Sequence, residues 1–131
     1  MKDIPRTVSW QEIEILLSRI ARELQPKKQN IQQIFGIPRG GTILAVMLSH
    51  HLNLPIIYDD KLIDEHTLIV DDAIITGNTF KELLLEKKCC GVLLYISQQA
   101  LADKELSSYP LLWTGMPKKD KEWLTFPWEK H

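Results

Sequence analysis

The sequence contains few cysteines, and the two that it has, Cys89 and Cys90, are adjacent. Neighbouring cysteines are poorly placed to bridge each other, and their spacing does not match that of a zinc site. No activating residues accompany them in the sequence, so we interpret both as reduced residues near the start of a buried strand. The expectation that follows is a cytoplasmic location.

The sequence also lacks an excess of charge and any long apolar run. Its 16 Lys and Arg residues oppose 17 Asp and Glu residues, so the formal net charge of −1 argues against a nucleic-acid partner. The apolar runs are short, and residues 1–6 contain no apolar signal core. We therefore expect no secretion signal, no transmembrane span and no membrane partner. The length of 131 residues predicts one domain, residues 1–131, with its own core.

Hydrophobic periodicity predicts alternating helices and strands. The helices are expected at 8–24, 42–52 and 80–88, with Ser9 as the N-cap of the first and Glu12 completing a capping box. The strands are expected at 31–37, 54–58, from 68 onward, at 91–97 and at 109–114, with partly helical residues at 98–108 and a turn at 115–120. This alternation predicts an α/β fold with a mainly parallel, doubly wound sheet, right-handed crossovers and helices on both faces.

The stretch 68–79, LIVDDAIITGNT, carries the clearest functional pattern. Gly77 permits close approach of the backbone to a ligand, and the hydroxyl and amide donors of residues 76–79 stand beside a helix N-terminus, which suits a phosphate. Asp71 and Asp72 can accept hydrogen bonds from a ribose diol or hold Mg²⁺. The alternative is a capped helix start that follows a solvated strand end.

A second strand, loop and helix pattern places a cation where the first places acids. The loop Pro38-Arg39-Gly40-Gly41 exposes backbone amides, and the Arg39 guanidinium can bind an anion. A plain glycine turn with a surface arginine is the alternative. Two loops of complementary charge at the ends of parallel strands favour a ligand site instead. Near the C-terminus, Trp123 and Trp128 either cap the core or present an aromatic surface to a ligand.

These motifs resemble those of the type I phosphoribosyltransferases. Residues 67–79 resemble the phosphoribosyl-pyrophosphate motif of that family, and residues 36–41 resemble its pyrophosphate loop. Residues 123–129 are similar to the C-terminal hood of the xanthine-guanine and related purine members, and the helix start at 8–10 fits that subgroup. The resemblance covers nearly the whole chain, and residues 109–131 are expected to contribute the hood.

The resemblance implies transfer of a phosphoribosyl group from phosphoribosyl pyrophosphate to a nucleobase, with a purine as the favoured base, release of pyrophosphate, Mg²⁺ as cofactor and a homodimer. It implies that Asp71, Asp72 and Arg39 are catalytic, and that Asp72 is the contact to Mg²⁺. It also implies a non-proline cis peptide bond in the pyrophosphate loop. The substrate-binding residues that it implies are Arg39, Gly40, Asp71, Asp72, Ala73, Ile74, Ile75, Thr76, Gly77, Asn78, Thr79 and Trp128.

Three features depart from the pattern of the purine members. Ile75 stands where a third acid usually acts near the base, and Ser97 or a neighbouring glutamine stands where a lysine usually ends the next strand. Only residues 59–66 are available for the mobile catalytic loop. These departures keep an alternative open, a non-catalytic or regulatory module that binds phosphoribosyl pyrophosphate or a nucleotide. The sequence does not favour a small hydrolase or another nucleotide-binding domain, because it contains neither a Gly-x-Gly-x-x-Gly motif nor a P-loop lysine.

Overall fold

A computed structural model describes residues 4–74, 79–119 and 121–129 and has one main sheet. The sheet has strand order β3-β2-β4-β5-β6, and every neighbouring pair is parallel. Its strands are β2 (Gln33–Gly36), β3 (Ile56–Ile57), β4 (Thr67–Ile74), β5 (Cys90–Ser97) and β6 (Leu112–Lys118). The α-helices are α1 (Trp10–Leu24), α2 (Gly40–Leu52), α3 (Thr79–Lys87), α4 (Gln98–Ala102) and α5 (Lys104–Ser107). Short 3₁₀ helices occupy Gln25–Asn30 and Asp60–Leu62.

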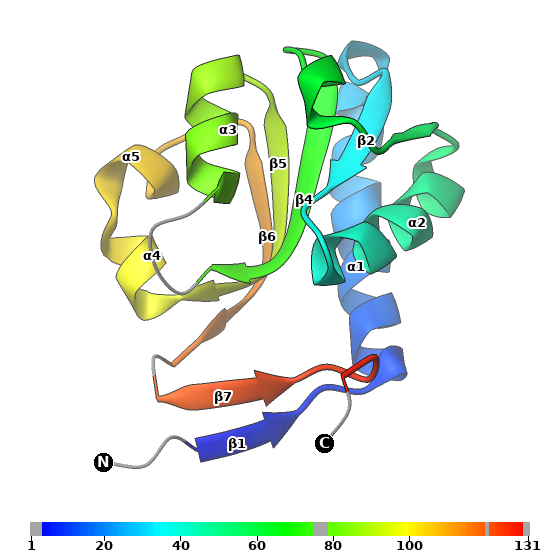
Figure 1. Cartoon of the computed structure of the whole chain (residues 1–131). Helices are drawn as coiled ribbons and strands as arrows, with labels where there is room; N and C mark the ends of the chain where they lie inside the picture. The colour runs from blue at the N-terminus through cyan, green and yellow to red at the C-terminus, as the bar shows by residue number, and fades with distance from the viewer. Residues whose placement is uncertain (1–3, 75–78, 120, 130–131) are drawn as a thin grey trace.

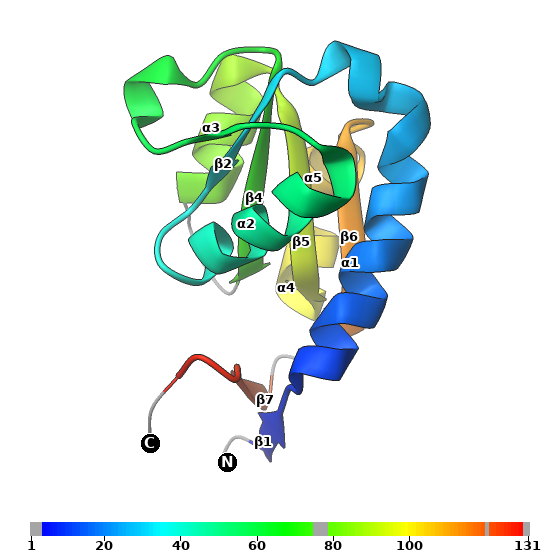
Figure 2. The same ribbon diagram turned by 90° about the vertical axis from the view of Figure 1, so that its right-hand side faces the viewer.

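The helices cover both faces of this sheet. In Figures 1 and 2, α1 and α2 lie on one face, and α3, α4 and α5 lie on the other. Two groups of buried apolar side chains correspond to these two layers. The predicted α/β architecture, a parallel sheet with helices on both faces, is confirmed.

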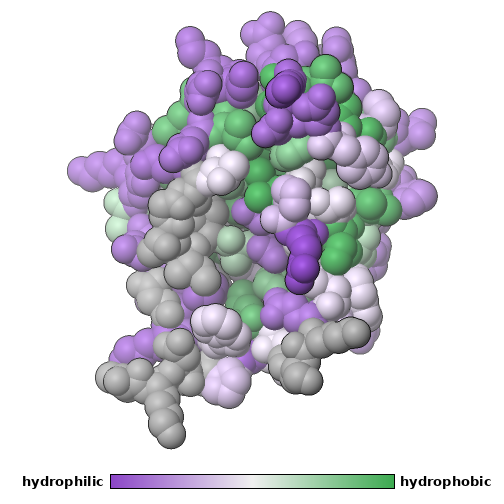
Figure 3. All heavy atoms as spheres, in the orientation of Figure 1, coloured by the Kyte–Doolittle hydropathy of each residue, from purple (hydrophilic) through white to green (hydrophobic). Residues whose placement is uncertain are grey.

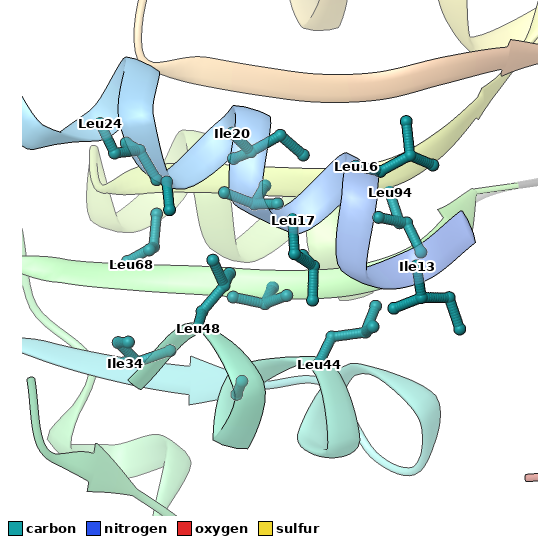
Figure 4. Packing of buried hydrophobic residues seen from close by; sticks show 14 of the residues in the cluster. Ile13, Leu16, Leu17, Ile20, Leu24, Ile34, Leu44, Leu48, Leu68 and Leu94 are labelled. Atoms are coloured by element: carbon teal, nitrogen blue, oxygen red, sulfur yellow. The ribbon is translucent and has the colours of Figure 1, made fainter. Parts of the chain in front are cut away.

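Helix α1 contributes the longest apolar stripe of the core. Its buried residues are Ile13, Leu16, Leu17, Ile20, Ala21 and Leu24. Figure 4 shows five of them facing Leu44 and Leu48 of α2 and the strand residues Ile34, Leu68 and Leu94. Burial of one such side chain contributes roughly 1.5–3 kcal/mol. This packing holds α1 and α2 against the sheet.

The order of the strands creates a switch point between β2 and β4. The chain leaves β2 through α2 and continues to β3 on one side, whereas it leaves β4 through α3 and continues to β5 on the other side. The connections after two adjacent parallel strands therefore diverge, and such a point is where ligands bind in open α/β sheets. The loop that holds Arg39 and the strand end that holds Asp72 both lie there.

A second, two-stranded sheet faces the carboxyl ends of the main strands. Strand β1 (Ile4–Thr7) pairs in parallel with β7 (Glu122–Thr125), in a register that runs from Ile4 opposite Glu122 to Thr7 opposite Thr125. We call β1, β7 and residues 126–129 the hood. Figure 1 shows it below the main sheet, at the end where β4 and β5 finish. The part played by residues 4–7 had no counterpart in the sequence predictions.

The predicted turn at 115–120 is wrong in its extent, because β6 continues to Lys118. Gly115 lets β6 stay against β5, since a Cβ at this position would overlap the backbone oxygen of Leu94. Arg19 of α1 donates from Nη2 to the carbonyl oxygens of Thr114 and Gly115, at 2.9 and 2.5 Å. A glycine that permits close strand packing and a glycine that makes a turn look alike in sequence.

Half of the predicted capping box is present at the start of α1. The backbone N–H of Glu12 donates to Oγ of Ser9 at 3.0 Å, as expected for an N-cap. The Glu12 carboxylate instead accepts from Arg6 and from Tyr95. Tertiary partners have replaced the local partner that the spacing predicted.

The face that Figure 3 shows has hydrophilic side chains along its upper edge, with hydrophobic patches between and below them. Within residues 4–74, 79–119 and 121–129, no helix combines the length and hydropathy that a membrane crossing requires.

Candidate functional site at the end of β4

Asp71 and Asp72 belong to strand β4 itself, which continues to Ile74. Each carboxylate accepts a bond from the next backbone N–H: Asp72 N donates to Oδ1 of Asp71 at 2.8 Å, and Ala73 N donates to Oδ1 of Asp72 at 2.7 Å. A hydrogen bond between the two carboxyl groups raises the pKa of Asp71 and lowers that of Asp72, so the two side chains lie beside each other.

Both carboxylates are half-buried, and this changes their acidity. Burial raises the pKa of Asp71 to about 8, and the negative charge of Asp72 adds to the rise. Burial also raises the pKa of Asp72 above its usual value, with a contribution from the negative charge of Glu129, whereas hydrogen bonds from Asp71 and from the backbone oppose the rise. Among residues 4–74, 79–119 and 121–129, no Lys, Arg or His forms an ion pair with either acid.

The loop after β2 meets Asp72 through Gly40. A Cβ at Gly40 would overlap Oδ2 of Asp72 and would lie 3.2 Å from Cζ2 of Trp128. A Cβ at Gly41 would instead overlap the backbone oxygen of Val70 in β4. Gly41 therefore serves the packing of α2 on β4, whereas Gly40 makes room for the Asp72 carboxylate.

Arg39 occupies the N-cap of α2, where the structure shows no capping bond from its side chain. The peptide bond between Pro38 and Arg39 is cis, which confirms the expectation for this loop. The first backbone N–H groups of a helix carry partial positive charge, so this end of α2 adds to the field of the guanidinium.

One cavity of about 550 Å³ joins these groups to the hood. It is lined by Arg39, Gly40, Asp72, Trp128 and Glu129. Four of these residues were predicted from the sequence, and the structure brings them together although they come from 39–40, 72 and 128. Asp71 is not one of the described lining residues. Glu129 was not predicted, and only its position beside Trp128 in the hood motif could have indicated it.

Trp128 belongs both to the cavity and to an aromatic stack. Its ring stacks on Phe126 with centroids 4.9 Å apart and 4° between the planes, and Trp10 lies tilted against it at 5.7 Å. Phe126 in turn lies 6.0 Å from the ring of Tyr95 on β5. The prediction that Trp128 binds substrate stays a prediction. The structure shows that one face of the indole already packs on Phe126.

A polar network fixes the hood to α1 and β5. Arg6 of β1 donates to Oε2 of Glu12 at 2.9 Å and lies over the Tyr95 ring, 5.5 Å from its centroid. The Tyr95 hydroxyl donates to the same carboxylate oxygen of Glu12. Sequence reasoning missed this network, because its members come from three separate elements and form no local motif.

Thr79 lies beside a second cavity, of about 610 Å³, on the α3 side of the β2 loop. Pro38 lines this second cavity, whereas its neighbour Arg39 lines the first, so the loop after β2 separates the two. Ala73 and Ile74 are the last residues of β4. The remaining predicted phosphate-loop residues, Ile75, Thr76, Gly77 and Asn78, lie outside the described residues.

Comparison with known proteins adds one relative in sequence and several in fold. No protein-family model matches the chain. Xanthine-guanine phosphoribosyltransferase of Idiomarina loihiensis is 26% identical, over 95% of this chain and 86% of its own. A purine phosphoribosyltransferase from Pyrococcus horikoshii has a TM-score of 0.68 at 22% identity, over 97% of this chain and 95% of its own.

A hypothetical protein from Neisseria gonorrhoeae, solved with bound ppGpp, has a TM-score of 0.78 at 19% identity, over 99% of this chain and 92% of its own. These structural likenesses establish the fold. The sequence relationship over nearly the full chain adds a similarity to a purine phosphoribosyltransferase.

Proposed function

We propose that this protein transfers the phosphoribosyl group of phosphoribosyl pyrophosphate to a nucleobase, with a purine as the favoured base. The observation that carries the proposal is the shared cavity of Asp72, Arg39, Gly40 and Trp128. It combines an acceptor for ribose hydroxyls, a cation for a leaving pyrophosphate and an aromatic ring for a base. The sequence relative has this activity in its name.

In this reaction the bond between C1 of the ribose and a pyrophosphate oxygen breaks, and a bond from C1 to a ring nitrogen of the base forms. The proton of that nitrogen passes to water or to the departing pyrophosphate. Positive charge develops on the ribose, and negative charge develops on the leaving group. Arg39 would bind the pyrophosphate, Asp72 would hold the ribose, and Trp128 would keep the base in line with C1.

The carboxylates fit Mg²⁺ as a partner of the substrate. Mg²⁺ prefers oxygen ligands and commonly takes one or two carboxylates together with substrate phosphates and water. Among the residues that the structure describes, no three His, Cys, Asp or Glu side chains converge as a metal site. Asp72, which lines the cavity, would hold the ion jointly with the substrate. Bound there, Mg²⁺ would neutralise charge on the pyrophosphate.

The two cavities divide the substrate between them in this proposal. Thr79 begins α3, whose N-terminus suits the 5′-phosphate, and it lines the cavity on the α3 side of the β2 loop. The pyrophosphate and the base would lie on the other side of that loop, with Arg39 and Trp128. Asp71 would support Asp72 and the ribose from beside it.

The test is binding and turnover with the Asp72→Asn variant. Calorimetry with phosphoribosyl pyrophosphate and Mg²⁺ should show a loss of about 1–3 kcal/mol in binding free energy, the range for a hydrogen bond to a charged group. The exposed Glu23→Gln variant, on α1, is the control and should bind as the wild type does. Unchanged affinity in Asp72→Asn, or no pyrophosphate release by the wild type with any purine, would count against the proposal.

A second candidate is a regulatory module that binds a purine nucleotide without turnover. Two observations favour it: Ile75 and Ser97 replace ionisable residues of the catalytic purine members, and the Neisseria neighbour of similar fold carries ppGpp. This candidate predicts saturable binding of guanine nucleotides with no formation of nucleotide from base and phosphoribosyl pyrophosphate. Base-dependent release of pyrophosphate would exclude it.

A further inference from the structure

The second half of the connection between β3 and β4 is held at the amino end of the sheet, away from the two cavities. Its centre is the buried Thr67, whose Oγ1 accepts from Asp64 N at 3.0 Å and from Nε2 of Gln33 at 2.9 Å. The same Gln33 amide donates to the carbonyl oxygen of Leu62 at 2.9 Å. Ile63 is 4% exposed and belongs to the core. This part of the connection is therefore fixed to the first residues of β2 and β4.

The first half of the connection reaches the carboxyl end of the sheet and is ordered there. Residues 58–60 line the cavity beside α3. Asp59 accepts a hydrogen bond from Lys61 N at 2.9 Å, and the 3₁₀ helix Asp60–Leu62 follows. Because Leu62 is tied to β2, this stretch is anchored at both of its ends. It forms a fixed wall of the cavity and not a lid that closes over it.

The hood, on the other side of the loop after β2, is fixed as well. Arg6 and Tyr95 both donate to the Glu12 carboxylate, which ties β1 to α1 and β5. Phe126 lies against Tyr95 and stacks on Trp128, which lines the cavity. Of the described segments beside the two cavities, the hood and the β3–β4 connection are thus both held in place by their own contacts.

The walls of both cavities reach the solvent. Arg39 and Glu129 of the first cavity are exposed, and so are Pro38 and Thr79 of the second. Tyr58, which lines the second cavity, is 73% exposed. Water can therefore reach a substrate that spans the loop after β2, on either side of that loop.

An active site that closes over its substrate excludes water and so prevents hydrolysis of a reactive intermediate. We propose that this protein, whose cavity walls are fixed and open to solvent, also hydrolyses phosphoribosyl pyrophosphate, with water in place of the base. The bond from C1 of the ribose to the pyrophosphate oxygen breaks, the water oxygen bonds to C1, and one proton of that water passes to the solvent. The products are ribose 5-phosphate and pyrophosphate. This proposal rests on the proposed function, because it uses the same sugar-phosphate site.

The test is release of pyrophosphate from phosphoribosyl pyrophosphate and Mg²⁺ in the absence of any base. A base held in line has an advantage over water, so we expect about 1–30% of the rate that a saturating purine supports. In heavy-oxygen water the released pyrophosphate should stay unlabelled, because the water attacks C1 and not phosphorus. Labelled pyrophosphate would reveal a phosphatase reaction and would overturn the proposal.

Variants assign the hydrolysis to this site. Asp72→Asn should lower the base-free and the base-dependent rates together, by about tenfold or more, and Arg39→Gln serves in its place if that variant does not fold. Trp128→Ala should slow transfer to the base more than hydrolysis, so the share of hydrolysis should rise by about tenfold. Glu23→Gln, exposed on α1, is the control and should keep both rates. A base-free rate that Asp72→Asn leaves unchanged would overturn the proposal.

Hydrogen exchange tests the fixed wall without measuring activity. The backbone amides of residues 59–67 should exchange within about threefold of the same rates with and without phosphoribosyl pyrophosphate and Mg²⁺, because their hydrogen bonds already exist in the free protein. Stronger protection on binding would mean that this segment closes over the substrate, and the reason for hydrolysis would be lost.

Hydrolysis and transfer can fail separately. A base-free rate below about 1% of the base-dependent rate would overturn hydrolysis and leave the proposed transfer in place. Release without a base, together with no transfer to any base, would support hydrolysis and overturn the transfer. Binding of phosphoribosyl pyrophosphate with no release in either condition would overturn both and would favour the regulatory module.

Discussion

Two clusters of partly buried charge lie at the carboxyl edge of the main sheet, and they are built in opposite ways. In the hood cluster, the Glu12 carboxylate has both Arg6 and the Tyr95 hydroxyl as partners. In the β4 cluster, Asp71 and Asp72 are like charges. Burial and the charge of Asp72 raise the pKa of Asp71, and burial and the charge of Glu129 raise the pKa of Asp72. The first cluster is complete within the protein. The second is stabilised by whatever positive charge or hydrogen-bond donor a ligand brings.

This difference indicates how the chain separates stability from function. Complementary groups drawn from β1, α1 and β5 fix the hood, so that Trp128 is held at the cavity. The adjacent acids at the end of β4, whose pKa values burial raises, are costly to ionise in the free protein, a common cost of preorganised binding sites. Four variants can break or sharpen the contrast, and they are ordered here from the largest expected effect to the smallest.

Gly41→Ala should destabilise the fold most, by about 3 kcal/mol, because the new methyl group would overlap the backbone of Val70, which cannot move away.

Gly40→Ala is the matched variant. Its methyl group would overlap only the end of the Asp72 side chain, so stability should change by less than about 1 kcal/mol while binding of phosphoribosyl pyrophosphate weakens about tenfold or more. Urea denaturation and calorimetry measure the two effects. Equal destabilisation by both substitutions would contradict the distinction between the two glycines.

Glu12→Gln should destabilise the protein by about 1–2 kcal/mol, since it removes the charge that pairs with Arg6 in a partly exposed setting. The loss should be measured by denaturation at neutral pH. Glu23→Gln on the same helix is the control: its pair with Arg19 is exposed and 4.0 Å long, so stability should not change measurably. A similar loss from both variants would mean that the hood cluster is no more than a surface ion pair.

Trp128→Ala should weaken binding of a purine nucleotide by about 1–2 kcal/mol, within the range for stacking of a base on an aromatic ring. Binding of phosphoribosyl pyrophosphate, which has no base, should change little. Trp123→Ala is the control, because Trp123 is 58% exposed and is not among the described residues that line the cavity. If Trp128→Ala weakened both ligands equally, the ring would be acting only through its packing on Phe126.

Asp71→Asn should stabilise the free protein by about 1 kcal/mol or more at pH 8. The folded protein holds this proton up to a pKa of about 8, whereas the unfolded chain releases it near 3.8, so wild-type stability falls as the pH rises between these values. The variant should lose this part of the pH dependence, and the difference should vanish near pH 4. Thermal melting between pH 4 and 8 tests this. Mg²⁺ should raise the wild-type melting temperature more than that of the variant.

Local patterns in the sequence were sufficient for the helices, for most of the strands and for four residues of the cavity. Strand β4 illustrates why: its apolar run, its two acids and the helix that follows are consecutive, so their geometry is set within a dozen residues. The capping role of Ser9 was equally local. The partner of Glu12 was not, because Tyr95 lies 83 positions away and competes successfully with the local N–H.

The sequence by itself determined that a charged loop and an acidic strand end occur in one α/β chain, because strand, turn and helix signals are short-range properties of neighbouring residues. Only the tertiary structure decided that β1 pairs with β7, that Gly40 rather than Gly41 touches Asp72, and that Lys118 is buried at the edge of β6. These outcomes depend on which distant segments pack together. Packing of the whole core and the register of the sheet determine which segments meet, and neither can be inferred from a local sequence pattern.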